Sequence, residues 1–215
     1  MKILSIRLEN FNMIKNALYS KVKEYDFEKL FKKKGYAYFT NGAYNLNIIG
    51  VRSAGRNITN SFDDVLVLIY KSPSGQWQRQ IYNITTDPGR YYMLNPVGRK
   101  GTAILVPGQY RGAYQIDKHR GKYLALCQKK PVKVYRDNNK NQVYDWDPAT
   151  LEQGLYGINI HKAGKLSQRV DTWSAGCQVF ASETDFKCFM NYCQKQIQNG
   201  LGKTFTYTLL NEEDL

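Results

Sequence analysis

Short runs of apolar, β-branched and aromatic residues, separated by turn residues, divide most of this sequence and constrain its fold more than any other feature. Such runs predict strands, because branched and aromatic side chains pack well on a sheet. The turn residues between them, such as Ser72-Pro73-Ser74-Gly75 and Pro107-Gly108, favour mainly antiparallel connections. The predicted strands are 44–52, 63–71, 76–85, 102–106, 109–117, 131–136, 155–161 and 203–210.

Helical periodicity lies near the two ends of the chain. Residues 10–34 place Phe11, Ile14, Leu18 and Val22 three and four positions apart, and three lysines followed by Gly35 are typical of a helix end. Residues 182–198 show the same spacing. We therefore expect a mainly β protein of the α+β class, an antiparallel β-sandwich or barrel with peripheral helices. Residues 1–40 would form an N-terminal helical segment and residues 41–215 one β-rich domain.

The chain is strongly basic, since 31 Lys and Arg residues against 18 Asp and Glu residues give a net charge of +13. This balance favours polyanionic partners, namely nucleic acid, anionic lipid or the anionic polymers of a bacterial cell wall. The 17 tyrosines are expected to cover sheet faces rather than to stack on bases. No nucleic-acid recognition motif is visible, so nucleic acid is an unfavoured partner.

Neither a membrane span nor an export signal is expected. The longest apolar run, 65–70, has six residues, whereas a membrane helix needs about 20. Arg7 and Glu9 interrupt the apolar residues at the start of the chain, which leaves too short a core for a signal peptide. We expect a protein made in the cytoplasm without a signal peptide.

The cysteines and histidines do not form a metal-binding pattern. Four cysteines and two histidines occur without a CxxC pair or an HExxH motif, so the sequence predicts no zinc site and no cofactor. Oxygen-bearing residues at 137–145 alternate as in a calcium loop. Gln142 and Pro148 stand where that loop needs a glycine and an acid, so a polar turn is favoured.

One cysteine and one histidine have the spacing of a catalytic pair. His161 ends a predicted strand, and Cys177 follows sixteen residues later, which allows a loop and an adjacent strand to bring the chain back. A nucleophilic cysteine needs a base, space beside the sulfur and N–H groups facing the oxyanion. His161 would be the base, Gly176 would leave the space, and the N–H groups of Gly176 and Cys177 would hold the oxyanion. Trp173 and Tyr156 are placed to wall the site.

The remaining cysteines and the second histidine are expected to be structural. Cys127, Cys188 and Cys193 are expected to be unreactive, because free cysteines are commonly buried. His119 is expected to lie in a surface loop, since it stands in the polar segment Asp117-Lys118-His119-Arg120-Gly121.

The segment around the pair resembles the L,D-transpeptidase (YkuD-type) family of peptidoglycan enzymes. That family has a strand-end histidine, a loop and then a Ser/Thr-His-Gly-Cys motif, which His161, Ser174, Gly176 and Cys177 match. Residues 106–116 are similar to the family's Pro-x-Gly-x-Phe/Tyr…Ile strands. The likeness spans about residues 101–180 and is most specific over 158–178.

Four positions depart from the family pattern, namely Lys162, Ala175, Gln178 and Val179. Ala175 stands in place of the histidine of the motif, and Lys162 in place of a glycine. Gln178 and Val179 stand where the family has an apolar residue followed by an arginine. Gln178 and Lys162 are expected to contact substrate, together with the two aromatic residues that wall the site.

The resemblance implies a cysteine-dependent enzyme that modifies peptidoglycan stem peptides through a thioester, with Cys177 as nucleophile and His161 as base and then acid. Without an export signal, a hydrolase of the bacteriophage lysin kind is favoured over a cross-linking L,D-transpeptidase, and it would reach the wall by lysis, in a virion or as an effector. Anionic wall polymers would attract its basic surface. Two alternatives stay open: a catalytically inactive wall-binding or virion structural module, and a nucleic-acid binder.

Overall fold

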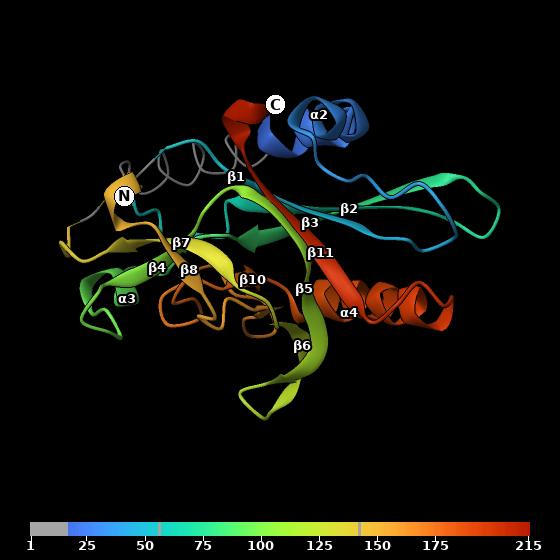
Figure 1. Ribbon diagram of the computed structural model, residues 1–215. Coiled ribbons are helices and arrows are strands. Elements are labelled where there is room, and N and C mark those ends of the chain that lie inside the picture. Colours follow the sequence, from blue (N-terminus) through green and yellow to red (C-terminus); the bar gives the residue numbers. More distant parts are fainter. Residues whose placement is uncertain (1–16, 56, 142) are drawn as a thin grey trace, which may run out of the picture.

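The chain forms one closed sheet of eight strands beside a smaller sheet of three strands (Figure 1). The computed structural model describes residues 17–215 apart from 56 and 142. Around the closed sheet the order is β1-β11-β5-β6-β9-β10-β3-β2, and β2 pairs with β1 again. The expectation of a mainly β fold with peripheral helices is confirmed. The strands of the closed sheet are β1 (Asn47–Arg52), β2 (Asp64–Lys71), β3 (Trp77–Thr85), β5 (Gly108–His119), β6 (Tyr123–Gln128), β9 (Ile160–Lys162), β10 (Gln178–Phe180) and β11 (Thr204–Asn211).

The smaller sheet and the helices lie around the closed sheet. The smaller sheet pairs β4 (Thr102–Leu105), β7 (Val132–Asp137) and β8 (Glu152–Gly154) antiparallel, with β7 in the middle. Among the described residues, no helix is long and apolar enough to cross a membrane. The helices are α2 (Phe27–Lys34), α3 (Arg90–Leu94) and α4 (Glu183–Gln198), with short 3-10 helices at Pro148–Thr150 and Glu212–Asp214.

The closed sheet is mainly antiparallel, as expected, but contains two parallel pairs. β1 pairs with β11 and β9 pairs with β10 in parallel, while the other neighbours pair antiparallel. A parallel pair needs a long crossover connection rather than a tight turn. The crossover from β9 to β10 runs through residues 163–177 and carries the candidate cysteine.

The predicted strand 155–161 is mostly irregular, and only its last two residues belong to β9. The N–H groups of Tyr156 and Ile158 donate to the side-chain Oε1 of Gln128, at 3.1 and 3.0 Å, instead of to a neighbouring strand. A side-chain acceptor thus replaces the hydrogen-bond ladder, because it satisfies the same backbone donors. The resulting loop passes directly beside the candidate cysteine.

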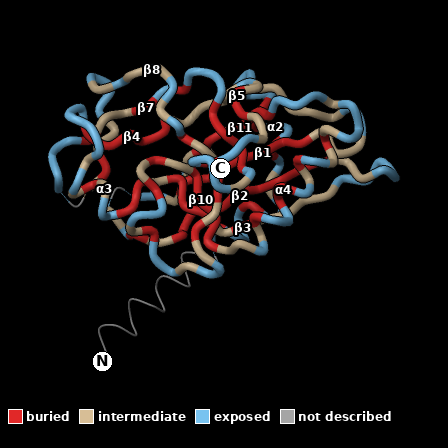
Figure 2. Tube along the Cα trace, turned by 90° about the horizontal axis from the view of Figure 1, so that it is seen from below, coloured by how far each residue is buried: buried red, intermediate tan, exposed pale blue. Residues whose placement is uncertain are grey.

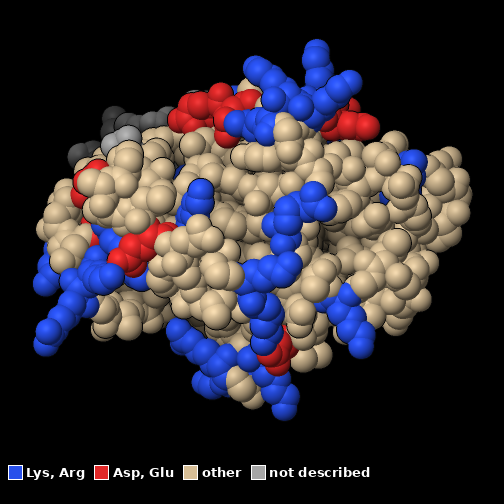
Figure 3. Space-filling model, viewed as in Figure 1, with Lys and Arg blue, Asp and Glu red and all other residues tan. Residues whose placement is uncertain are grey.

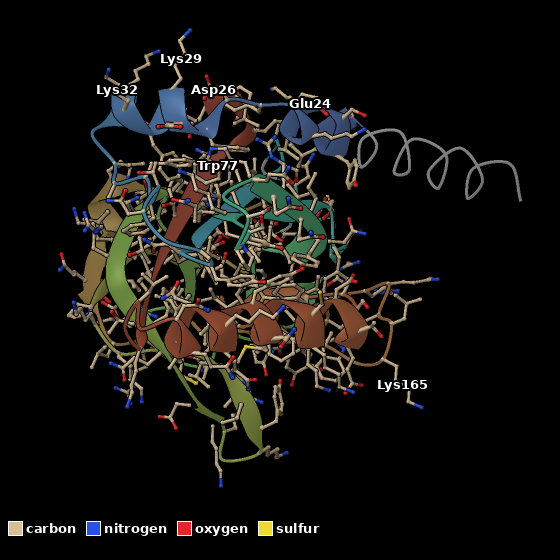
Figure 4. The ribbon with its side chains drawn as sticks, turned by 90° about the vertical axis from the view of Figure 1, so that its right-hand side faces the viewer. Glu24, Asp26, Lys29, Lys32, Trp77 and Lys165 are labelled. Carbon is tan, nitrogen blue, oxygen red and sulfur yellow. The ribbon has the colours of Figure 1, made fainter. Side chains whose placement is uncertain are left out.

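The predicted helix 10–34 is interrupted. Its first apolar positions, Phe11 and Ile14, lie outside the described residues; residues 17–23 are helical and α2 begins anew after a break. Asp26 causes the restart, because its side chain accepts a hydrogen bond from the N–H of Lys29 at 3.0 Å. Gly35, with φ 68°, ends α2 as predicted. Lys29 projects from α2 away from the sheet (Figure 4).

Two apolar clusters stabilise the fold from opposite faces of β1 and β2. Leu66 and Leu68 of β2 face the main cluster, which includes residues of α4, whereas Val65 and Val67 face a second cluster formed with the N-terminal helices. In Figure 1, α2 and α4 accordingly lie on opposite sides of these strands. Figure 2 shows the buried segments running through the centre of the molecule. Both faces of β2 are therefore covered, and all its residues except the last are buried.

Candidate active site

The parallel pair β9–β10 brings the two candidate catalytic segments together. Gln178 pairs with Ile160 and Val179 with His161, so Cys177 directly precedes the paired part of β10. The N–H of Gln178 donates to the carbonyl of Asn159 at 2.9 Å. The expectation that the chain returns beside His161 within sixteen residues agrees with this arrangement.

A tight turn at residues 174–177 presents Cys177. The buried Ser174 hydroxyl donates to the carbonyl of Cys177 at 2.8 Å and accepts a hydrogen bond from the N–H of Gly176 at 3.1 Å. Gly176 has φ 120°, and a Cβ there would lie 2.3 Å from the carbonyl oxygen of Ala103. Ser174 and Gly176 therefore shape the turn.

The expected oxyanion hole needs a correction. The N–H of Gly176 is bonded to Ser174 and is unavailable to a substrate. The N–H of Cys177 has no acceptor within the part of the chain that the structure describes, so it is the donor that remains.

The Tyr114 hydroxyl is buried without a hydrogen-bond partner among the described residues. Burial raises the pKa of Tyr114 well above its ordinary range, and the charge of a Cys177 thiolate acts in the same direction.

The crossover that carries Cys177 is anchored by a residue that sequence reasoning missed. Asn60 donates from Nδ2 to the carboxylate of Asp171 at 2.6 Å and accepts the N–H of Asp171 at 2.8 Å. The N–H of Gly89 donates to the carbonyl of Ser174 at 2.8 Å. Asn60 and Asp171 both adopt positive φ, at 56° and 41°, which asparagine and aspartate tolerate better than other residues. These contacts hold the turn before Cys177 in place.

The Cys177 thiol is partly exposed and is hydrogen-bonded in its neutral form. Its sulfur lies 3.3 Å from the carbonyl oxygen of Gly157, to which the S–H donates, and 3.5 Å from the N–H of Asn159. Burial raises the pKa of Cys177 to about 11, although the Asn159 N–H acts in the opposite direction. The resting residue is therefore a thiol at neutral pH, and chemistry would need a base.

The His161 ring is held in the tautomer that such a base needs. A carbonyl can only accept, so the 2.9 Å contact between Nδ1 and the carbonyl of Lys162 places the proton on Nδ1 and leaves the lone pair on Nε2. Burial lowers the pKa of His161 to about 3, with a further contribution from His119, so the ring stays neutral. No hydrogen bond joins the Cys177 sulfur to His161 in the described part of the chain.

His119 does not lie in a surface loop as expected but is a buried part of this site. It is the last residue of β5, is 7% exposed, and its ring stacks on that of His161 with centroids 4.2 Å apart. Asn159 bonds to Nδ1 of His119 at 3.1 Å, while its Oδ1 accepts the N–H of Gln128 at 2.8 Å. The Asn159 amide is thus oriented with Nδ2 toward His119, so His119 carries its proton on Nε2. A hairpin signal, Arg120-Gly121 between two strands, could have located it.

Gln178 is not a substrate contact, which corrects that expectation. It is fully buried, and its Oε1 accepts the hydroxyl of Tyr207 at 2.7 Å. Its Nε2 donates to the carbonyls of Thr86 and Gly176, both at 3.3 Å. Gly50 leaves room for this contact, because a Cβ there would lie 1.8 Å from the Tyr207 hydroxyl. Gln178 therefore ties the turn to the core.

Lys162 and the two aromatic residues lie around the site without contacting the sulfur. Lys162 forms an ion pair with Glu183 at 3.4 Å at the start of α4 and lines a groove of about 310 Å³ that Cys177 does not line, so its expected substrate contact is not supported. Trp173 is 44% exposed. Tyr156 packs against the main cluster, with a guanidinium over its ring.

The residues described here form no group of three or more metal-ligating side chains. In the calcium-like segment, Oδ2 of Asp137 accepts the N–H of Asp145 at 2.9 Å, and Oδ1 of Asn141 accepts the N–H of Val143 at 2.7 Å. Side chains that accept from nearby backbone N–H groups are typical of polar turns.

Comparison with models of known protein families, with curated proteins and with solved structures returned no match. The likeness to L,D-transpeptidases stays a prediction from the motif residues.

Proposed function

We propose that this protein is a cysteine-dependent enzyme that cleaves peptide bonds of peptidoglycan stem peptides through a thioester, with hydrolysis favoured over cross-linking. The observation that carries the proposal is the juxtaposition on β9 and β10, where Cys177 lies one residue before the strand that pairs with His161. The thiol is accompanied by a neutral imidazole with its lone pair on Nε2 and by a backbone N–H that has no acceptor among the described residues. These are the groups that acyl transfer by a thiol requires.

The chemistry would begin with the exchange of one hydrogen bond. The Cys177 S–H turns from the carbonyl of Gly157 to Nε2 of His161 and gives its proton to that nitrogen as sulfur attacks the substrate carbonyl carbon. The C–S bond forms, and the N–H of Cys177 stabilises the oxyanion. When the tetrahedral intermediate collapses, the C–N bond breaks and the His161 imidazolium protonates the leaving amine. Water, deprotonated by His161, then attacks the thioester, which releases an acid and restores the thiol.

The test is incubation with purified peptidoglycan and with free muropeptides, followed by mass spectrometry. Wild type and a Cys188→Ala control, which alters the exposed cysteine of α4, should give the same products. Cys177→Ala should give none. Products that have gained water indicate hydrolysis, and joined stem peptides indicate cross-linking. No products from wild type on several wall types would overturn the proposal.

A catalytically inactive wall-binding or virion structural module is the second candidate. It is favoured by the raised pKa of Cys177 and by the S–H contact with Gly157. Alkylation of Cys177 as a function of pH, with and without muropeptides, separates the two candidates. An enzyme predicts that muropeptides change the rate at Cys177 near pH 7, whereas an inactive module predicts a rate that rises only toward pH 11 and ignores them.

A further inference from the structure

The β5–β6 hairpin ends in a three-residue loop, residues 120–122, beside the candidate site, because His119 pairs with Tyr123. The N–H of Lys122 donates to the carbonyl of His119 at 3.0 Å, and the residues between them, Arg120 and Gly121, have φ of 51° and 70°. Two positive φ values between hydrogen-bonded residues three apart are typical of a type I′ turn, whose first central position favours asparagine, aspartate or glycine. Arginine is an unfavourable residue at this place.

The unfavourable backbone of Arg120 calls for a functional explanation. A long side chain in the left-handed region crowds the carbonyl that follows, and such residues cluster at ligand-binding and catalytic sites. Arg120 is exposed, and within residues 17–55, 57–141 and 143–215 it forms no ion pair and no side-chain hydrogen bond. No contact within the described fold accounts for an arginine here.

The position of Arg120 relative to the site is set by its neighbour. His119 stacks on His161 at 4.2 Å and bonds to Asn159, whose N–H contacts the Cys177 sulfur. Arg120 is thus one residue from a ring that belongs to the site.

The positive charge of Arg120 acts on Cys177, His119 and His161. Burial raises the pKa of Cys177 and lowers those of His119 and His161; the guanidinium lowers all three. The other charged or titratable groups at the pair are Lys162 and Tyr123. In Figure 3 basic side chains gather where Figure 1 shows this hairpin, which also carries the exposed Lys118 and Lys122.

We propose that Arg120 is a specificity residue that binds a carboxylate of the acyl donor beside Cys177, so that the substrates are peptides with a free carboxylate close to the scissile bond. A guanidinium presents a planar pair of donors that matches the two oxygens of a carboxylate. This inference rests on the proposed cysteine chemistry, and its test does not require wall cleavage.

The test is competitive alkylation of the full chain by iodoacetate, an anion, and iodoacetamide, its neutral isostere. Peptide mass spectrometry measures, at each cysteine, the ratio of modification by iodoacetate to modification by iodoacetamide. The ratio at Cys177 is divided by the ratio at Cys188 in the same sample, and this quotient is the readout. Arg120→Asn should lower this quotient about fivefold, the effect expected in water for one opposite charge about 4 Å from the bound carboxylate of the reagent. Arg120→Lys should keep most of it, and Lys122→Gln, which removes the same charge from the same hairpin, should change it less than about twofold.

Stability supplies an independent readout. Asparagine is favoured at the first position of a type I′ turn, so Arg120→Asn should unfold at a higher urea concentration than wild type while it loses the preference for the anion. A quotient in Arg120→Asn equal to that of wild type overturns the inference even if the wall assay yields products. A quotient that depends on Arg120, without wall products from wild type, retains the carboxylate site and overturns the proposed function instead.

Discussion

Gly176 is the residue at which the turn before Cys177 tolerates least change. Its φ is 120°, and an added Cβ would meet the carbonyl oxygen of Ala103 at 2.3 Å. Gly176→Ala should therefore lower the free energy of unfolding by roughly 2–4 kcal/mol, because backbone strain and a backbone clash add. Urea denaturation measures this loss.

Gly75 is the matched control. It also has positive φ, 81°, but nothing lies within 4 Å of an added Cβ. Gly75→Ala should lower the free energy of unfolding by about 1 kcal/mol, the cost of the left-handed conformation alone. Equal losses in both variants would show that the approach of Ala103 is not what constrains Gly176.

The residues of the site differ in how far the sequence reveals them. The spacing of His161 and Cys177 predicts their adjacency, because sixteen residues are enough for one crossover. The sequence does not reveal that Gln178 is buried, since its partners come from distant strands. Arg120-Gly121 can place His119 at the end of a hairpin, but only the pairing of β6 with β9, between residues far apart in the sequence, brings it next to His161.

The ends of β1, β2 and β3 meet at a buried cluster of charged side chains. Arg52 is 1% exposed, and its Nε lies 2.8 Å from Oδ1 of Asp87. Asp64 accepts the N–H groups of Ser53 at 2.8 Å and Thr86 at 2.6 Å. Arg52 pairs with Asp87 alone, while the charges of Asp64 and Asp87 both act on the neighbouring Asp63.

Asp63 should make stability depend on pH. Burial, and then the charge of Asp64, raises the pKa of Asp63 from 3.8 to about 8. A raised carboxyl pKa stabilises the fold at low pH, and this contribution is lost as pH rises from about 4 through 8. Asp63→Asn, which stays neutral, should match wild type near pH 4 and become the more stable protein above pH 8, as measured by urea unfolding at pH 4, 6 and 9.

Asp64→Asn provides the contrast for this experiment. Its carboxylate accepts two backbone N–H groups, and an amide can replace only one of its two oxygens as acceptor. It should therefore destabilise the protein at every pH. An Asp63→Asn curve parallel to that of wild type would exclude Asp63 as the titrating group.

At the level of elements, the sequence reveals strands best where β-branched and aromatic residues are dense. β2 and β3 begin and end within one residue of the predicted runs 63–71 and 76–85. The sequence does not reveal β6, because Tyr-Leu-Ala-Leu-Cys-Gln contains no β-branched residue. β10 has three residues, too few to show the alternation of apolar and polar residues typical of a strand. It forms because β9 and β3 pair with it on its two sides.

The charge of the whole molecule should govern its association with anionic polymers. The net charge is +13, and Lys and Arg side chains are spread over the face shown in Figure 3. Binding to purified wall that carries anionic polymers should weaken steeply between about 0.05 and 0.5 M NaCl, because salt screens exposed charges. Co-sedimentation measures the bound fraction.

Two controls separate charge from catalysis. Cys177→Ala should bind wall with the same salt dependence as wild type, since it leaves the charge unchanged. Wall stripped of anionic polymers should retain less protein at low salt. Binding that ignores salt would contradict the electrostatic account, and tighter binding to DNA than to wall would favour the nucleic-acid alternative.

The position of β11 between β1 and β5 has a consequence for synthesis of the protein on the ribosome. β11 is the last strand of the chain, whereas β1 and β5 lie within its first 119 residues. Until residues 204–211 have emerged, the nascent chain carries two strands with unpaired edges, the kind of surface through which growing chains associate. Closure of the sheet is thus among the last events of folding, because it waits for residues 204–211.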